Sequence, residues 1–117
     1  MKVEVLTFCD RLPKEPYYRP HAFHASLARL GRSATVVGYG EPFRSLMTKE
    51  RTYRAWLRAN NPDCDLLVIC DCWDILFQRP PDEIADIFPK FNADVVFNAE
   101  INCFPRADLA DRFPDPG

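Results

Sequence analysis

The chain has 117 residues, of which 47% are hydrophobic and 27% are charged, and this composition is that of one ordinary globular domain. Its formal net charge of −2 gives no electrostatic reason to expect nucleic acid or an anionic membrane surface as a partner. No apolar run approaches the ~20 residues of a transmembrane helix, and the first residues lead directly into a strand-like pattern and not a signal peptide. The cysteines are odd in number and irregularly spaced, so we expect reduced thiols and a cytoplasmic location.

The first predicted strand and helix lie on either side of a proline-rich loop. Residues 2–8 alternate between apolar and polar side chains, as a strand does. Residues 10–20 are polar and rich in proline, and we interpret them as a surface loop. Phe23, Leu27 and Leu30 follow at the spacing of one helical face, and a glycine directly after them acts as a C-terminal stop. The sequence therefore predicts a strand, a loop and an amphipathic helix in this region.

Two histidines, His21 and His24, stand three residues apart at the start of this helix. Histidines at that spacing can bind a metal, but no third ligand is near them in the sequence. We therefore interpret both as solvated side chains of the first helical turn.

A glycine-containing loop separates the second predicted strand from the second helix. Residues 34–37 form an apolar strand pattern, and Gly38 and Gly40 permit a tight turn after it, although two glycines are too few for a phosphate-binding fingerprint. The helix that follows has one stripe of side chains: Tyr53, Trp56, Leu57 and Asn60. Lys49 lies near the start of this helix, where its charge opposes the helix dipole. It is either a solvated lysine or a contact for a bound polyphosphate.

The most informative stretch is an apolar run that ends in two carboxylates. Residues 66–70 contain no Gly or Pro, and this pattern predicts a strand buried on both faces at the centre of a parallel sheet. We expect residues 67–69 to be almost fully buried, with strands on both sides. Asp71 and Asp74 follow at the carboxyl edge, where open α/β sheets bind their ligands. A hard divalent ion, Mn²⁺ or Mg²⁺, would relieve their mutual repulsion. The alternative is that Asp71 caps a turn and Asp74 points into water.

A third helix and a fourth strand complete the predicted order. Two prolines followed by two acidic residues at 80–83 are typical of a helix start, and Pro89 predicts an early break. Residues 93–98 predict the fourth strand, and only a short turn is expected over 106–113. The order is β-α-β-α-β-α-β, and right-handed crossovers make it a Rossmann-like parallel sheet with helices on both faces. We expect residues 1–117 to form a single α/β domain.

Several motifs resemble the glycosyltransferase domain of the procollagen lysyl hydroxylases, which has viral and bacterial relatives. Asp-Cys-Trp-Asp-Ile-Leu-Phe at 71–77 is similar to the family's Asp-x-Tyr-Asp-Val-x-Phe signature. Residues 96–100, 103–105 and 109–114 resemble its Phe-x-Ala-Glu, Cys-Trp-Pro and Leu-Ala-x-x-Tyr-Pro stretches in the same order. Residues 38–43 resemble its Gly-x-Gly-x-x-Trp loop. The resemblance extends over nearly the whole chain and implies the GT-A-like fold of nucleotide-diphospho-sugar transferases.

The resemblance implies transfer of a hexose from a UDP-sugar donor to a hydroxyl acceptor, with Mn²⁺ or Mg²⁺ bridging the diphosphate. Asp71 and Asp74 would be the metal ligands, and Trp73, where the family has tyrosine, would stack on the uracil. Thr7 would line the uridine pocket, and Lys49 would contact the diphosphate. The metal would stabilise the negative charge on the leaving UDP as a Lewis acid.

Three departures from the family pattern weigh on this expectation. The loop between Gly40 and Lys49 is shorter than the family's, and Phe43 replaces its tryptophan. The family's later Asn-Ser-Gly-Gly block and distal metal-binding histidine lie beyond this sequence, so we expect a truncated domain with the donor-binding half alone. The alternative is a non-catalytic remnant that serves as a small binding or assembly module. An incomplete sheet would also expose an edge, so we expect self-association.

Overall fold

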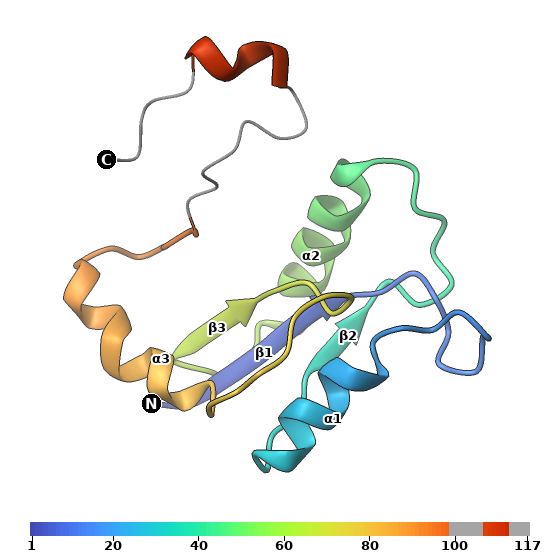
Figure 1. Cartoon of the computed structure of the whole chain (residues 1–117). Helices are drawn as coiled ribbons and strands as arrows, with labels where there is room; N and C mark the ends of the chain where they lie inside the picture. The colour runs from blue at the N-terminus through green and yellow to red at the C-terminus, as the bar shows by residue number, and fades with distance from the viewer. Residues whose placement is uncertain (99–106, 113–117) are drawn as a thin grey trace. The chain divides into compact units, whose positions relative to one another are not determined.

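A computed structural model describes residues 1–98 and 107–112 of the chain (Figure 1). The chain divides into two compact units, Met1–Ile87 and Phe88–Gly117. The first unit contains, in order, β1 (Val3–Phe8), α1 (His21–Arg29), β2 (Thr35–Val37), α2 (Leu46–Asn60), β3 (Leu66–Ile69) and α3 (Asp82–Ile87). The predicted alternation of strands and helices is confirmed up to the third helix, while the expectation of a single domain stays a prediction.

The sheet of the first unit has three parallel strands in the order β2-β1-β3. Leu6 of β1 lies opposite Thr35 of β2, and Val3 of β1 lies opposite Leu66 of β3. The chain passes from β1 to β2 on one side and then returns to β3 on the other side of β1. This arrangement confirms the predicted α/β fold with a Rossmann-like parallel sheet. Because the strands are parallel, their carboxyl ends meet at one edge, which is where such sheets bind ligands.

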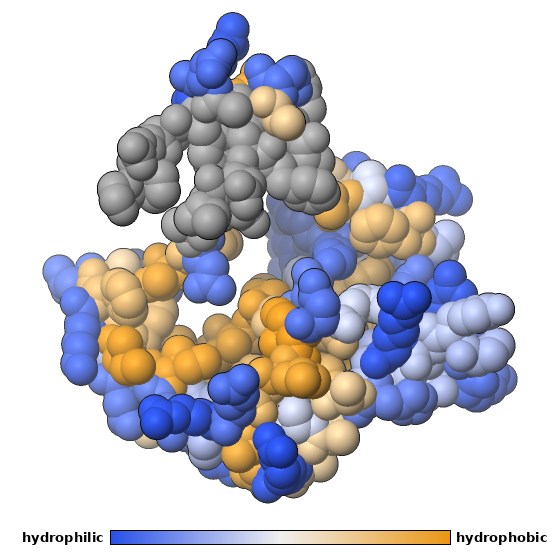
Figure 2. All heavy atoms as spheres, in the orientation of Figure 1, coloured by the Kyte–Doolittle hydropathy of each residue, from blue (hydrophilic) through white to orange (hydrophobic). Residues whose placement is uncertain are grey.

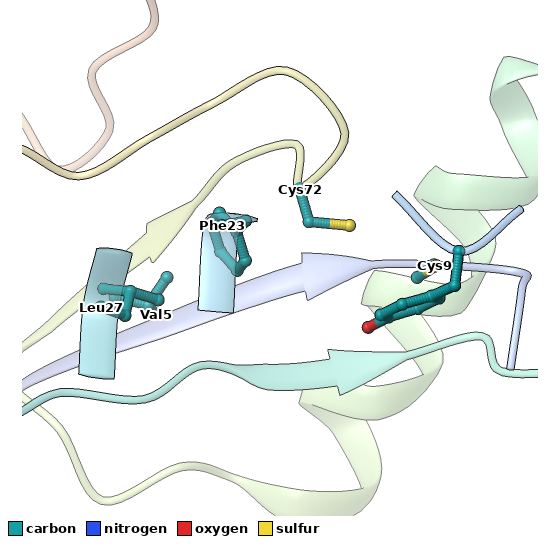
Figure 3. Packing of buried hydrophobic residues seen from close by; sticks show 6 residues of the cluster. Val5, Cys9, Phe23, Leu27 and Cys72 are labelled. Carbon is teal, nitrogen blue, oxygen red and sulfur yellow. The ribbon is translucent and has the colours of Figure 1, made fainter. Parts of the chain in front are cut away.

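Alternation along β1 divides the core of this unit into two clusters, one on each face of the sheet. Val5 packs with Phe23 and Leu27 of α1, and Figure 3 shows the three side chains together. Leu6 and Phe8 point to the opposite face, which α2 covers. Figure 1 shows the two helices on opposite sides of the sheet. Fully burying a large apolar side chain contributes roughly 1.5–3 kcal/mol, so the buried Phe23 and Leu27 side chains hold α1 firmly against the sheet. By contrast, α2 has no fully buried residue.

The prediction that residues 66–70 form the central strand is wrong. β1 is the central strand, and β3 lies at an edge of the three-stranded sheet. Leu67 and Val68 are only partly buried, and Ile69 is 47% exposed. Apolar residues accordingly gather over β3 and the segment that follows it, as Figure 2 shows. An apolar run indicates that both faces of a strand are packed against other elements. It does not indicate whether the strand has a neighbouring strand on each side.

The predicted fourth strand is also wrong, because residues 93–98 form no strand. Val95, Val96 and Phe97 are 64%, 40% and 87% exposed. A strand is stabilised by ladder hydrogen bonds to a neighbour, and an apolar β-branched run cannot supply these alone. The Ala-Glu pair at residues 99–100, which belongs to one of the resembling blocks, lies outside the described residues.

The third helix begins where the sequence predicts and ends at the expected break. α3 has Asp82 and Glu83 in its first turn, and a 3₁₀ segment (Phe88–Phe91) that contains Pro89 opens the second unit. A further 3₁₀ segment (Ala107–Arg112) is described within the predicted short turn. Among the described residues, no helix combines the length and apolarity needed to cross a membrane.

Candidate functional site at the carboxyl edge of the sheet

Thr7 is the penultimate residue of the central strand, β1, and its side chain is completely buried. Its hydroxyl is the buried side-chain polar atom that has no hydrogen-bond partner in the described part of the chain. Burial raises the pKa of the Cys72 thiol, and the nearby Thr7 hydroxyl partly offsets this rise. The Cys72 thiol donates its hydrogen bond to the Phe8 carbonyl oxygen (3.3 Å). An unpaired buried hydroxyl costs about 1–3 kcal/mol, so this atom is a candidate for a ligand or water contact. In this conformation, however, the Thr7 side chain is not open to solvent.

The loop after β2 is tied to the end of β1 by backbone and ring contacts. The Cys9 N–H donates to the Val37 carbonyl oxygen (2.9 Å), and the Gly40 N–H donates to the Asp10 carbonyl oxygen (2.8 Å). Gly38 has φ +92°, and a Cβ atom at this position would lie 2.3 Å from Cε2 of the buried Phe8 ring. Only glycine therefore permits this close approach. In the loop at 38–43, which resembles the family's Gly-x-Gly loop, Gly38 thus allows the backbone to pack directly against the Phe8 ring.

A hydrogen-bonded network that sequence reasoning missed joins the first and second loops at this edge. The buried Tyr18 hydroxyl lies 2.8 Å from Nε2 of His24 and 3.0 Å from the Tyr39 hydroxyl. Burial lowers the pKa of His24 below its usual value, with a smaller contribution from the charge of His21. The Tyr18 hydroxyl therefore links His24 and Tyr39 in one chain of hydrogen bonds, whose direction is set by the ring nitrogen of His24 that carries the proton. The interpretation of His24 as a solvated side chain is therefore wrong.

We expect the free energy of unfolding to fall when the pH is lowered through about 6.5, because of His24. The unfolded chain binds a proton at His24 near the usual pKa of 6.5, whereas the folded chain binds it only at lower pH. The loss should therefore start near 6.5 and level off below the pKa of the folded state. Urea unfolding at several pH values measures it. His24→Gln should remove this slope, while His21→Gln, which removes only the smaller charge effect, should largely retain it. An unchanged slope in His24→Gln contradicts the assignment.

The first carboxylate of the Asp-x-x-Asp motif is held by a cation from α2. Lys49, in the first turn of that helix, forms an ion pair between its Nζ and Oδ1 of Asp71, just beyond β3. The side chains are 26% and 49% exposed. One turn later on α2, Tyr53 packs its ring edge against Phe8 (6.5 Å between ring centroids). Burial raises the pKa of Tyr53, and the nearby charge of Asp71 raises it further. The structure thus brings two of the predicted site residues together.

The other predicted residues of the motif are not brought into contact with this pair. The Asp74 side chain is exposed and makes no hydrogen bond or ion pair in the part of the chain that the structure describes. Trp73 is half-buried and packs against the cluster that contains Val5 and Cys72. Its ring is therefore only partly open for stacking on a base. The roles predicted for both residues stay predictions.

Burial disfavours the reactive thiolate form of the cysteines in the described part of the chain. Cys9, Cys64, Cys70 and Cys72 are free thiols. Burial raises the pKa of Cys9 and of Cys70 to about 11, so both are protonated at neutral pH. The thiolate is the nucleophile, so the raised pKa makes Cys9 and Cys70 weak nucleophiles at neutral pH. Within residues 1–98 and 107–112, no group of three or more His, Cys, Asp or Glu side chains could hold a metal ion.

The comparisons with known proteins identify the family. The PLOD GT domain family matches residues 16–116. The chain is 29% identical over 103 residues to procollagen-lysine,2-oxoglutarate 5-dioxygenase 2 of Homo sapiens, which covers 80% of this chain and 14% of the relative. It is 28% identical over 89 residues to the human multifunctional procollagen lysine hydroxylase and glycosyltransferase LH3, which covers 76% of this chain and 11% of the relative. It is also 37% identical over 54 residues to the uncharacterized protein R699 of Acanthamoeba polyphaga mimivirus, covering 44% of this chain.

These matches concern one part of much longer proteins, because the chain spans 11% to 14% of the length of these relatives. The motif at 71–77 and the loop at 38–43 both lie within the matched residues. Of the blocks at 96–100, 103–105 and 109–114 that also carry the resemblance, residues 99–100, 103–105 and 113–114 lie outside the described residues. The family match nevertheless extends over most of the sequence. This chain therefore belongs to the family of glycosyltransferase domains found in the procollagen lysyl hydroxylases.

Proposed function

We propose that this chain binds a UDP-sugar through a divalent cation held by Asp71 and Asp74, and that it contributes to transfer of a hexose to a hydroxyl acceptor. The observation that carries the proposal is the ion pair between Lys49 and Asp71 at the carboxyl edge of the sheet. An ammonium and a carboxylate side by side, in a member of a glycosyltransferase family, support this proposal. A diphosphate that carries a divalent ion is complementary to such a pair of charges.

The residues present are compatible with Mn²⁺ or Mg²⁺. Both ions prefer oxygen ligands, and Mg²⁺ usually takes only one or two carboxylates from the protein, with water and phosphate oxygens completing its shell. Asp71 and Asp74 supply two carboxylates after β3, and Asp74 has no competing partner among the described residues. The metal, when bound, would act as a Lewis acid on the leaving diphosphate.

The chain's own residues would bind and orient the donor. Lys49 would lie against a phosphate oxygen, and Asp71 and Asp74 would fix the position of the diphosphate through the cation. Trp73 would offer an aromatic face to the uracil, and base stacking of this kind is worth about 1–3 kcal/mol elsewhere. Thr7, with its unpaired hydroxyl, would supply a polar contact in the uridine pocket. Self-association of the chain stays a prediction.

Calorimetric titration with UDP tests the proposal. We expect weak but measurable binding of UDP when Mn²⁺ is present, because the two carboxylates and the diphosphate share the cation. Chelation of the metal should abolish it. An exchange of UDP for uridine serves as the control, since uridine lacks the diphosphate and should not require the metal. If UDP at millimolar concentration gives no binding heat with or without Mn²⁺, the proposed function is wrong.

A further inference from the structure

The first turns of α2 are built so that Lys49 approaches the end of β3. The helix begins after Ser45, whose N–H donates to Oγ1 of Thr48 (3.3 Å). Lys49 and Tyr53 are four residues apart and therefore share one face of the helix. The Tyr53 ring is fixed against Phe8, at the end of the neighbouring strand. This packing sets the position of the helix turn that carries Lys49.

In the free protein, the ion pair offsets an unfavourable electrostatic interaction of each partner. A cation in the first turn of a helix is disfavoured by the helix dipole. The Asp71 carboxylate, three residues from a second carboxylate, gains a counter-charge. Only 26% of the Lys49 side chain is exposed, so the ammonium lies partly shielded from solvent screening. In the absence of a ligand, each of the two charges is therefore stabilised by the other.

A divalent ion and this ammonium compete for the same carboxylate. Metal alone would place a double positive charge beside Lys49 and take away its partner. A diphosphate that arrives with the metal would offer Lys49 a replacement partner of the same sign and chemistry as Asp71. We infer that Lys49 is an exchangeable counter-ion that disfavours binding of the metal alone and favours binding of the metal together with a nucleotide diphosphate.

This inference rests on the proposed function and adds a property to it, namely that the metal and the nucleotide bind cooperatively. By thermodynamic linkage, the factor by which UDP tightens Mn²⁺ equals the factor by which Mn²⁺ tightens UDP. A lysine that only stabilises the fold would change neither factor. The coupling factor therefore separates the two roles.

The experiment measures Mn²⁺ binding with and without saturating UDP, from the electron paramagnetic resonance signal of free Mn²⁺. The variant is Lys49→Met, which removes the charge and retains an unbranched apolar stem. The control is Lys14→Met, which removes a charge from an exposed lysine that has no ion pair among the described residues. We expect Lys49→Met to bind Mn²⁺ alone more tightly than the wild-type chain and to lose about fivefold or more of the coupling factor. Lys14→Met should match the wild type, and Lys49→Arg should retain most of the coupling.

Each outcome has a distinct meaning. If the wild-type chain binds UDP with Mn²⁺, but Lys49→Met binds Mn²⁺ alone with unchanged or weaker affinity, the inference is overturned and the proposed function stands. If the wild-type chain binds no UDP in either condition, the proposed function fails and this inference fails with it. Should Lys49→Met not fold, Lys49→Gln removes the same charge with a polar side chain, and the same comparison decides.

Discussion

Replacing Asp74 with alanine should weaken Mn²⁺-dependent binding of UDP by at least about tenfold. Loss of groups that merely orient a metal ligand typically costs about 10- to 100-fold in metal affinity, and loss of a ligand should cost no less. The same substitution should leave the free energy of unfolding within about 0.5 kcal/mol, since the side chain is exposed and unpaired among the described residues. Titration calorimetry and urea unfolding measure the two quantities.

A matched control for this substitution is Asp86→Ala on α3. Asp86 is also an exposed carboxylate without a hydrogen bond or ion pair in the described ranges, so the change in net charge is the same. UDP binding by this variant should be unchanged. If Asp74→Ala binds UDP with Mn²⁺ as tightly as Asp86→Ala does, Asp74 is not a metal ligand. Unfolding of Asp74→Ala would instead assign the carboxylate a structural role.

Gly38→Ala should destabilise the first unit by about 2–5 kcal/mol. Left-handed backbone costs a residue with a Cβ atom about 1–2 kcal/mol. The Cβ would also lie 2.3 Å from the Phe8 ring, which is 1% exposed and cannot move away without disturbing the core. Overpacking of this kind costs about 1–3 kcal/mol. The thermal midpoint and the urea midpoint should both fall.

Gly40→Ala separates the two causes of this loss. Gly40 also has a positive φ, +75°, but a Cβ atom there would meet nothing within 4 Å. This variant should lose only the backbone contribution, about 1–2 kcal/mol. The difference between the variants measures the contact between Gly38 and Phe8. Equal losses would mean that the Phe8 ring adapts without cost.

The Gly38 contact also bears on the site. Phe8 follows Thr7 directly and packs against the Tyr53 ring on the helix that carries Lys49. A displaced Phe8 ring would shift this helix turn relative to Asp71. We therefore expect the residual folded Gly38→Ala chain to bind UDP and Mn²⁺ more weakly than Gly40→Ala does.

The alternation of strands and helices up to the third helix, and the place of the acidic motif, could be predicted from the amino-acid sequence alone. Both follow from local signals, namely the period of the apolar residues and the positions of glycine and proline. Asp71 and Asp74 come after an apolar strand run, and a strand in a parallel sheet carries the residues after it to the carboxyl edge. Membership of the glycosyltransferase family could likewise be predicted from the motif and its spacing to later blocks.

Which strand is central, and which side chains are in contact, could not be predicted from the sequence and follows from the packing of the whole fold. The run at 66–70 is as apolar as a central strand, yet β3 has β1 as its neighbour and Ile69 remains exposed, because pairing depends on distant segments. Lys49 and Asp71 are 22 positions apart in the sequence, and no local pattern predicts their ion pair. The hydrogen bond between Tyr18 and Tyr39, 21 positions apart, is likewise not predictable from either segment. Such contacts depend on how helices pack on the sheet, and the periodicity of a single segment contains no information about its partner.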